Sequence, residues 1–244
     1  MSFGVTIAGG TLIPAKRVYA SALQSTGIMN TVVYDLTRGR YYTYNASNPF
    51  ITASSMKVPI MLTFFGMIEQ QGRGPTSQEM NLLTTMIENS NNDSASALYY
   101  NKIGGAAGVT RFFQKIGISG LFPNPRAWGY SLVYPSTMVQ MLTRLYQGSI
   151  LTVHDRNLAL FLMEHVQADQ RVGVGDTAPR GATVALKDGW VVAQDGLWVM
   201  NSSAIVTLGK ETYIIAAYTR DDSSLVAGQS IVRQICSQVA SQLH

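Results

Sequence analysis

Strand patterns occupy both ends of this chain and helix patterns occupy its middle, and this order constrains the fold more than any other feature. β-Branched and aromatic residues dominate 31–45, where a polar link at 37–40 predicts a hairpin. Helix patterns run from about residue 54 to residue 180, and strand patterns return at 183–219 before a C-terminal helix. We therefore expect an α/β (α+β) fold with an antiparallel sheet built from both chain ends, flanking terminal helices and an all-helical lobe.

This order predicts a division into two lobes. Residues 1–48 and 181–244 are assigned to an α/β lobe and residues 49–180 to an all-helical lobe, with the functional site at their junction. A chain of 244 residues is long enough for a full hydrophobic core. Only 13% of its residues are charged and 46% are apolar, which favours a compact globule over a disordered chain.

Charge and hydropathy exclude several kinds of partner. The net charge of +4 is spread along the chain and forms no Lys/Arg stripe, so no nucleic-acid partner is expected. No apolar run approaches the ~20 residues that span a bilayer. Residues 1–10 lack the charged start and apolar core of a signal peptide, which fits either a chain that is not exported or a trimmed mature one. We expect a monomer that takes a small-molecule substrate.

Several local patterns refine the helix predictions. Residues 15–25 predict a short amphipathic helix, and Thr76 followed by Glu79 predicts a capped helix start. Apolar residues at helical spacing in 232–243 predict the C-terminal helix. The glycines of 173–178 mimic a dinucleotide loop, but Pro179 follows and no helix is expected to open there.

The first pattern with chemical content is Ser54-Ser55-Met56-Lys57 at the start of a predicted helix. A serine hydroxyl is a poor nucleophile until a base removes its proton, and residues three apart on a helix share a face. Lys57 is therefore placed to act as the base for Ser54. The helix N-terminus lowers the pKa of this lysine, and the Ser54 N–H can form half of an oxyanion hole.

Two further patterns follow in order. Ser90-Asn91-Asn92 lies between two predicted helices, where a second hydroxyl can pass a proton to a leaving nitrogen and an amide can hold substrate. Lys187-Asp188-Gly189 lies on the first strand after the helical block. The lysine supplies positive charge, the glycine lets substrate approach the strand, and the N–H of Trp190 can complete the oxyanion hole.

Simpler explanations exist for each pattern. Ser54 and Lys57 suit a helix cap and a solvated lysine, and residues 90–92 suit an ordinary turn. The histidines (His154, His165 and His244) have no metal-ligand spacing and no accompanying G-x-S-x-G elbow, so neither a metal, nor a cofactor, nor a Ser-His-Asp triad is expected. The three patterns support a catalytic function only when their order in the sequence and their predicted secondary structure are taken together.

Together the patterns resemble the S-x-x-K, S-D-N and K-T-G signature of class A β-lactamases and related penicillin-binding proteins. The resemblance runs from about Thr31 to the C-terminal helix, and is closest to divergent class A-related serine hydrolases, whose strand reads like residues 187–190 preceded by a stretch like 170–174. It implies a β-lactamase-like fold and a cell-envelope or secreted location. It also implies the following roles: Ser54 as nucleophile, Lys57 as base, Ser90 as proton shuttle, Asn92 as substrate holder and Lys187 as electrostatic anchor.

Three departures from the family pattern modify the expected activity. Asn91 and Asp188 replace the usual acid and hydroxyl, and no carboxylate occurs between Asp93 and Asp155, where class A enzymes carry a deacylating glutamate. We therefore expect slow deacylation. An ionised Asp188 in the site is expected to disfavour substrates with a carboxylate, ordinary penicillins included.

The sequence predicts a serine acyl-enzyme hydrolase of β-lactams or related amides and esters. Two alternatives stay open at this point. One is a D,D-peptidase or esterase of the same penicillin-recognising superfamily, and the other is a binding protein that is acylated once or not at all.

Overall fold

The computed structural model describes residues 12–14, 28–45 and 47–243. The helix predicted at 15–25 lies outside these residues. Within them, the main sheet has the strand order β1-β3-β2-β9-β8-β7. Its strands are β1 (Leu12–Pro14), β2 (Ile28–Asp35), β3 (Arg40–Tyr44), β7 (Thr183–Val192), β8 (Trp198–Leu208) and β9 (Glu211–Asp222).

Both ends of the chain contribute to this sheet, as the sequence predicts. The N-terminal strand β2 pairs antiparallel with the C-terminal strand β9, with Val33 opposite Ile215. The hairpins β2–β3 and β8–β9 and the pair β7–β8 are also antiparallel, while β1 pairs parallel with β3. The expected antiparallel sheet is therefore confirmed, and β7 lies at its edge.

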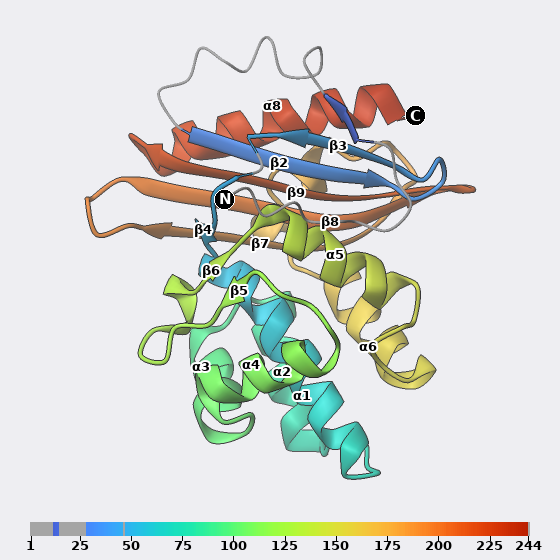
Figure 1. Ribbon diagram of the computed structural model, residues 1–244, viewed down its shortest axis with the longest axis vertical. Coiled ribbons are helices and arrows are strands. Elements are labelled where there is room, and N and C mark those ends of the chain that lie inside the picture. The colour runs from blue at the N-terminus through green and yellow to red at the C-terminus, as the bar shows by residue number, and fades with distance from the viewer. Residues whose placement is uncertain (1–11, 15–27, 46, 244) are drawn as a thin grey trace.

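The helices lie in two groups on either side of the sheet (Figure 1). The C-terminal helix α8 (Leu225–Leu243) runs along one face. The other helices come mainly from the middle of the chain, and α5 packs against β2, β8 and β9. They are α1 (Lys57–Gln70), α2 (Ser77–Glu88), α3 (Asn92–Asn101), α4 (Gly105–Lys115), α5 (Pro135–Tyr146) and α6 (Val153–Glu164). The short helix α7 (Val174–Thr177) packs against α8 instead.

A second, small sheet connects the segment between α4 and α5 to the residues just before α1. Its strands are β4 (Phe50–Ile51), β6 (Leu132–Val133) and β5 (Leu121–Phe122), in the order β4-β6-β5. The sequence did not predict these two-residue strands, because they are too short to show a period of two. They hold the loop after α4 beside the chain that leads to Ser54.

Local sequence signals explain several helix ends. Thr76 caps α2 and forms a capping box with Glu79, as predicted. Proline at N1 starts α5. The prediction that no helix opens after Gly173 is wrong, because α7 forms one helical turn at Val174–Thr177 before Pro179. This turn packs against α8, a tertiary contact that a local pattern does not reveal.

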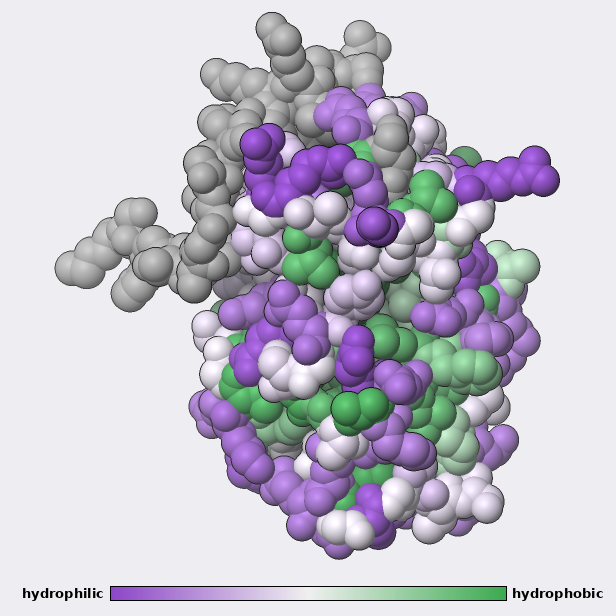
Figure 2. All heavy atoms as spheres, turned by 90° about the vertical axis from the view of Figure 1, so that its right-hand side faces the viewer, coloured by the Kyte–Doolittle hydropathy of each residue, from purple (hydrophilic) through white to green (hydrophobic). Residues whose placement is uncertain are grey.

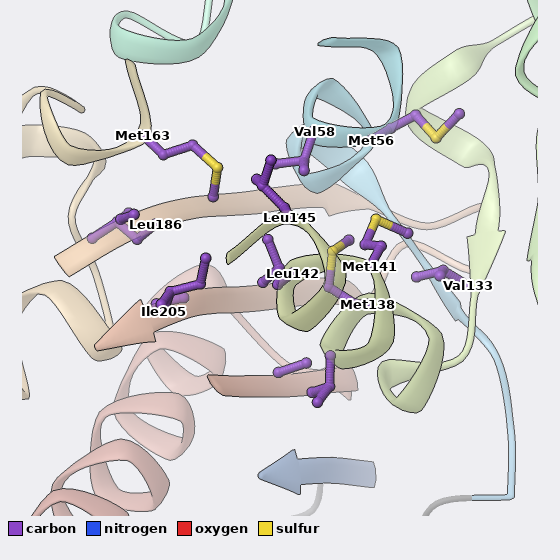
Figure 3. Packing of buried hydrophobic residues seen from close by; sticks show 14 of the residues in the cluster. Met56, Val58, Val133, Met138, Met141, Leu142, Leu145, Met163, Leu186 and Ile205 are labelled. Atoms are coloured by element: carbon purple, nitrogen blue, oxygen red, sulfur yellow. The ribbon is translucent and has the colours of Figure 1, made fainter. Parts of the chain in front are cut away.

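The core between α5 and the sheet is continuous with the base of α1 (Figure 3). Met138, Met141, Leu142 and Leu145 of α5 are fully buried, and lie with Met56, Val58 and Ile205 in this cluster. Unbranched methionine side chains fill irregular spaces of this kind. The element that carries the predicted nucleophile is therefore fixed to the sheet by close packing.

The molecular surface mixes polar and apolar residues on the side seen in Figure 2. Apolar side chains reach the surface over α6, where Val153 and Phe161 are exposed. In the described part of the chain, none of the helices combines the length and apolar character needed to cross a membrane.

Candidate active site

Ser54 and Lys57 lie on consecutive turns at the start of the first long helix. Ser54 belongs to a 3₁₀ turn at Ala53–Met56, and Lys57 begins α1 directly after it. Side chains three residues apart are eclipsed in a 3₁₀ turn, which brings them closer than in an α-helix. Lys57 Nζ lies 3.0 Å from Ser54 Oγ, within hydrogen-bond reach. The structure therefore brings the predicted nucleophile and base together.

The backbone that presents Ser54 is strained and firmly held. Ala53 has a φ of +45°, a conformation that non-glycine residues rarely adopt. Such strain persists only where the surroundings hold the chain. Asn201 of β8 helps to fix the chain here, because its Nδ2 donates hydrogen bonds to the carbonyl oxygens of Ile51 and Thr52, each at 2.8 Å.

The turn between α2 and α3 places two more predicted residues around the same amine. Ser90 has a φ of +55°, and its Oγ lies 2.9 Å from Lys57 Nζ. The carbonyl oxygen of Ser90 also accepts from this amine, and Asn92 Oδ1 accepts at 2.8 Å. The structure thus brings Ser54, Lys57, Ser90 and Asn92 into one contact network.

These contacts suit a lysine that acts as a base. The Ser90 carbonyl and Asn92 Oδ1 can only accept hydrogen bonds, so they orient two N–H groups of the amine. A neutral amine has two such groups and one lone pair. The lone pair is then left for one hydroxyl group at a time, that of Ser54 or that of Ser90, to donate to it.

Burial makes the neutral form of Lys57 accessible near neutral pH. Its side chain is fully buried, and this desolvation, together with the positive charge of Lys187, lowers its pKa from 10.5 to about 6. In the described residues no carboxylate contributes to this shift. A buried amine with a lowered pKa, in contact with a hydroxyl, is the arrangement required for general-base activation of a serine.

The strand β7 passes close to the nucleophile at Gly189. A Cβ atom on this residue would lie 2.6 Å from the Ser54 nitrogen and 2.8 Å from the Ser55 nitrogen. Only glycine allows this approach without a backbone shift. The neighbouring Lys187 is fully buried, its Nζ donates to the Asp188 carbonyl oxygen at 3.2 Å, and burial lowers its pKa to about 8.

The structure corrects the expectation for Asp188. Successive side chains of a strand point to opposite faces, so the Asp188 carboxylate points away from Lys187. It accepts a hydrogen bond from the Val172 N–H at 2.6 Å, on the face that α8 covers, and burial raises its pKa to about 7. The side chain of Trp190 follows the same alternation. Asp188 therefore anchors the loop before α7, and its carboxylate does not face the substrate side.

Sequence reasoning missed Asn201 and Trp128. The indole ring of Trp128 lies against the amine of Lys57, with Nζ 5.2 Å from the ring centroid. Its Nε1 donates to Ser96 Oγ of α3 at 3.1 Å. Neither residue belongs to a recognisable motif, and the only signal for Trp128 was a tryptophan in the carboxylate-free loop 120–134.

Among the described residues, no group of three or more His, Cys, Asp or Glu side chains is arranged to hold a metal ion. What these residues form is a buried amine in contact with two hydroxyls and an amide, beside a second buried lysine.

Comparisons with known proteins concern the family and the fold of the chain. The model of the "beta-lactamase enzyme family" matches residues 14–80 and 66–243, which is nearly the whole chain. No curated protein matches significantly by sequence. Similar solved structures include the TLA-3 extended-spectrum β-lactamase, with a TM-score of 0.83 and 17% identity over 93% of this chain and 97% of that one.

Two other similar structures are PBP-A and a β-lactamase from Chitinophaga pinensis. PBP-A has a TM-score of 0.81 and 18% identity over 95% of this chain and 97% of its own. The Chitinophaga enzyme has a TM-score of 0.81 and 19% identity over 94% and 98%. At these identities the likeness shows the fold.

Proposed function

The chain belongs to the beta-lactamase enzyme family, a family of hydrolases, and from this premise we propose that it is a serine acyl-enzyme hydrolase of the class A type. Ser54 is the nucleophile, and the substrate is a β-lactam or a related amide or ester. The observation that carries the proposal is the position of Lys57 Nζ, 3.0 Å from Ser54 Oγ and 2.9 Å from Ser90 Oγ.

Acylation follows from these contacts. Neutral Lys57 takes the proton of Ser54 as Oγ bonds to the substrate carbonyl carbon. The backbone N–H groups of Ser54 and Trp190 stabilise the oxyanion, and Lys187 adds positive charge beside them. When the carbon–nitrogen bond breaks, the proton passes from Lys57 through Ser90 Oγ to the leaving nitrogen. Asn92 holds the amide of the substrate.

Deacylation is the slow step in this proposal. A hydrolytic water needs a base within hydrogen-bond reach. No carboxylate occurs in the sequence between Asp93 and Asp155, and in the described residues none contributes to the Lys57 pKa. Lys57 would have to serve both steps. The acyl-enzyme therefore accumulates before it is hydrolysed.

The same carboxylate-free loop also suits a D,D-peptidase or esterase of the superfamily, whose donor is a peptide or ester in place of a β-lactam. In either case we propose that the substrate is a small molecule or peptidoglycan-like fragment of the cell envelope, that the protein acts there as a monomer, and that the site lies at the junction of the two lobes.

Turnover of a chromogenic cephalosporin tests the proposal. We expect a burst of one product per enzyme followed by a slow steady state, with no burst in Ser54→Ala. Fast linear turnover would contradict slow deacylation. Release of D-alanine from a D-Ala-D-Ala peptide, with no reaction of the cephalosporin, would favour the peptidase.

A further inference from the structure

The indole ring of Trp128 lies against the Lys57 amine, next to the four oxygen atoms that contact Nζ. Ser54 Oγ, Ser90 Oγ, the Ser90 carbonyl and Asn92 Oδ1 surround Nζ. The indole ring lies against it at 5.2 Å from the centroid, and Lys57 has no exposed surface.

The gap between amine and ring is too small for a water molecule. A water bonded to Nζ lies about 2.9 Å away, and it needs about 3.5 Å to the carbon atoms of the ring. A water 3.5 Å from the ring carbons lies about 3.2 Å above the centroid, so a water between the two groups needs roughly 6.1 Å along this line. The observed 5.2 Å is too short for it.

Trp128 is also held in this position from behind. Its side chain is almost completely buried, with 9% exposed, and its Nε1 donates to Ser96 Oγ at 3.1 Å. Ser96 lies on α3, one turn after Asn92, so the same helix that supplies a ligand of Lys57 also orients the ring. Rotation of the indole away from the amine would break this hydrogen bond.

We propose that Trp128 is a positioning residue that excludes hydrolytic water from Lys57 and so sets the lifetime of the acyl-enzyme. The inference rests on the proposed acyl-Ser54 intermediate. In hydrolysis a water oxygen bonds to the acyl carbon, the bond from Ser54 Oγ to that carbon breaks, and the proton of the water passes through the base to Oγ. The ring blocks the place from which Lys57 could take that proton.

The test is the decay of a penicillin adduct, followed by intact-mass spectrometry after excess penicillin is removed. Trp128→Ala opens the space beside Lys57, and we expect the adduct to decay at least tenfold faster than in the wild type. Trp128→Phe retains a ring, so its decay should stay within threefold of wild type. Ser96→Ala loosens the indole and should give an intermediate rate.

Two further variants keep this test decisive. Trp128→Leu leaves part of the space open while retaining apolar volume, so it substitutes for Trp128→Ala if that variant does not fold. Trp198→Ala is the control, because Trp198 is a half-buried tryptophan that lies at the start of β8, outside the proposed site. Its adduct should decay as in the wild type.

The outcomes separate the inference from the proposed function. Adducts that form normally in the wild type, Trp128→Ala and Trp128→Leu but decay at the same rate would overturn the role of Trp128 and leave the acyl-enzyme intact. A wild-type protein that forms no adduct with penicillins, cephalosporins or esters would overturn the proposed function itself. Faster decay that also appears in Trp198→Ala would indicate general loosening and would contradict the inference.

Discussion

Acylation of Ser54 should follow the titration of Lys57, because only the neutral amine can accept the serine proton. Burial, with the charge of Lys187, lowers the Lys57 pKa from 10.5 to about 6. The acylation rate should therefore fall about tenfold for each pH unit well below 6 and level off about one unit above it.

The structure allows the size of this effect to be worked out. With a pKa of 10.5 about 0.03% of the lysine would be neutral at pH 7, and with a pKa of about 6 about 90% is neutral. The lowered pKa thus raises the amount of active base roughly 3,000-fold, which corresponds to about 5 kcal/mol. Because Lys187 provides part of the shift, Lys187→Met should move the acid limb of the profile to higher pH.

Single-turnover labelling with a fluorescent penicillin between pH 4.5 and 9 measures this profile, and Ser54→Ala provides the blank. The wild type should show an acid limb near pH 6, and Lys187→Met should show a higher one together with a lower plateau. A labelling rate that does not change between pH 5 and 7.5, or that rises only above pH 9, would refute Lys57 as a desolvated base.

Three substitutions test the elements that position the nucleophile and the strand. Gly189→Ala places a Cβ 2.6 Å from the Ser54 nitrogen, so the rate of labelling should fall at least a hundredfold. Gly74→Ala is the control and should label normally, because a Cβ at that position meets no atom within 4 Å. Asn201→Ala removes two hydrogen bonds to the chain before Ser54, and thermal unfolding should show a loss of about 1–3 kcal/mol with slower labelling. Asp188→Thr should change kcat/KM by a similar factor for penicillins and for neutral esters, because the carboxylate faces α8; a selective gain for penicillins would show that it acts on substrate.

The order of hydrophobic patterns was sufficient to predict the architecture. The β2–β3 hairpin, the β8–β9 hairpin, the capped start of α2 and the helix α8 all have local signals, and the structure confirms them. The short strands β4, β5 and β6 and the single turn of α7 depend on tertiary contacts. The division into lobes at residues 48 and 181 stays a prediction, and α5 from the middle segment packs closely on the sheet.

Site residues that belong to a sequence motif could be predicted. Residues that contact the site only in the folded chain could not. Ser54, Lys57, Ser90 and Asn92 were predicted from two short patterns, and the structure brings their side chains into contact. For Asp188, motif position alone was misleading, because the alternation of β7 directs its carboxylate to the α8 side. Lys57 meets Trp128 only in the folded chain, so no spacing rule reveals it.

The central claim is a covalent intermediate on Ser54, and intact-mass spectrometry of the protein with a penicillin over time tests it most directly. We predict a shift by the full mass of the penicillin, located by peptide mapping on Ser54, that persists after the free compound is removed. Absence of the adduct, or an equal adduct in Ser54→Ala, would contradict the account.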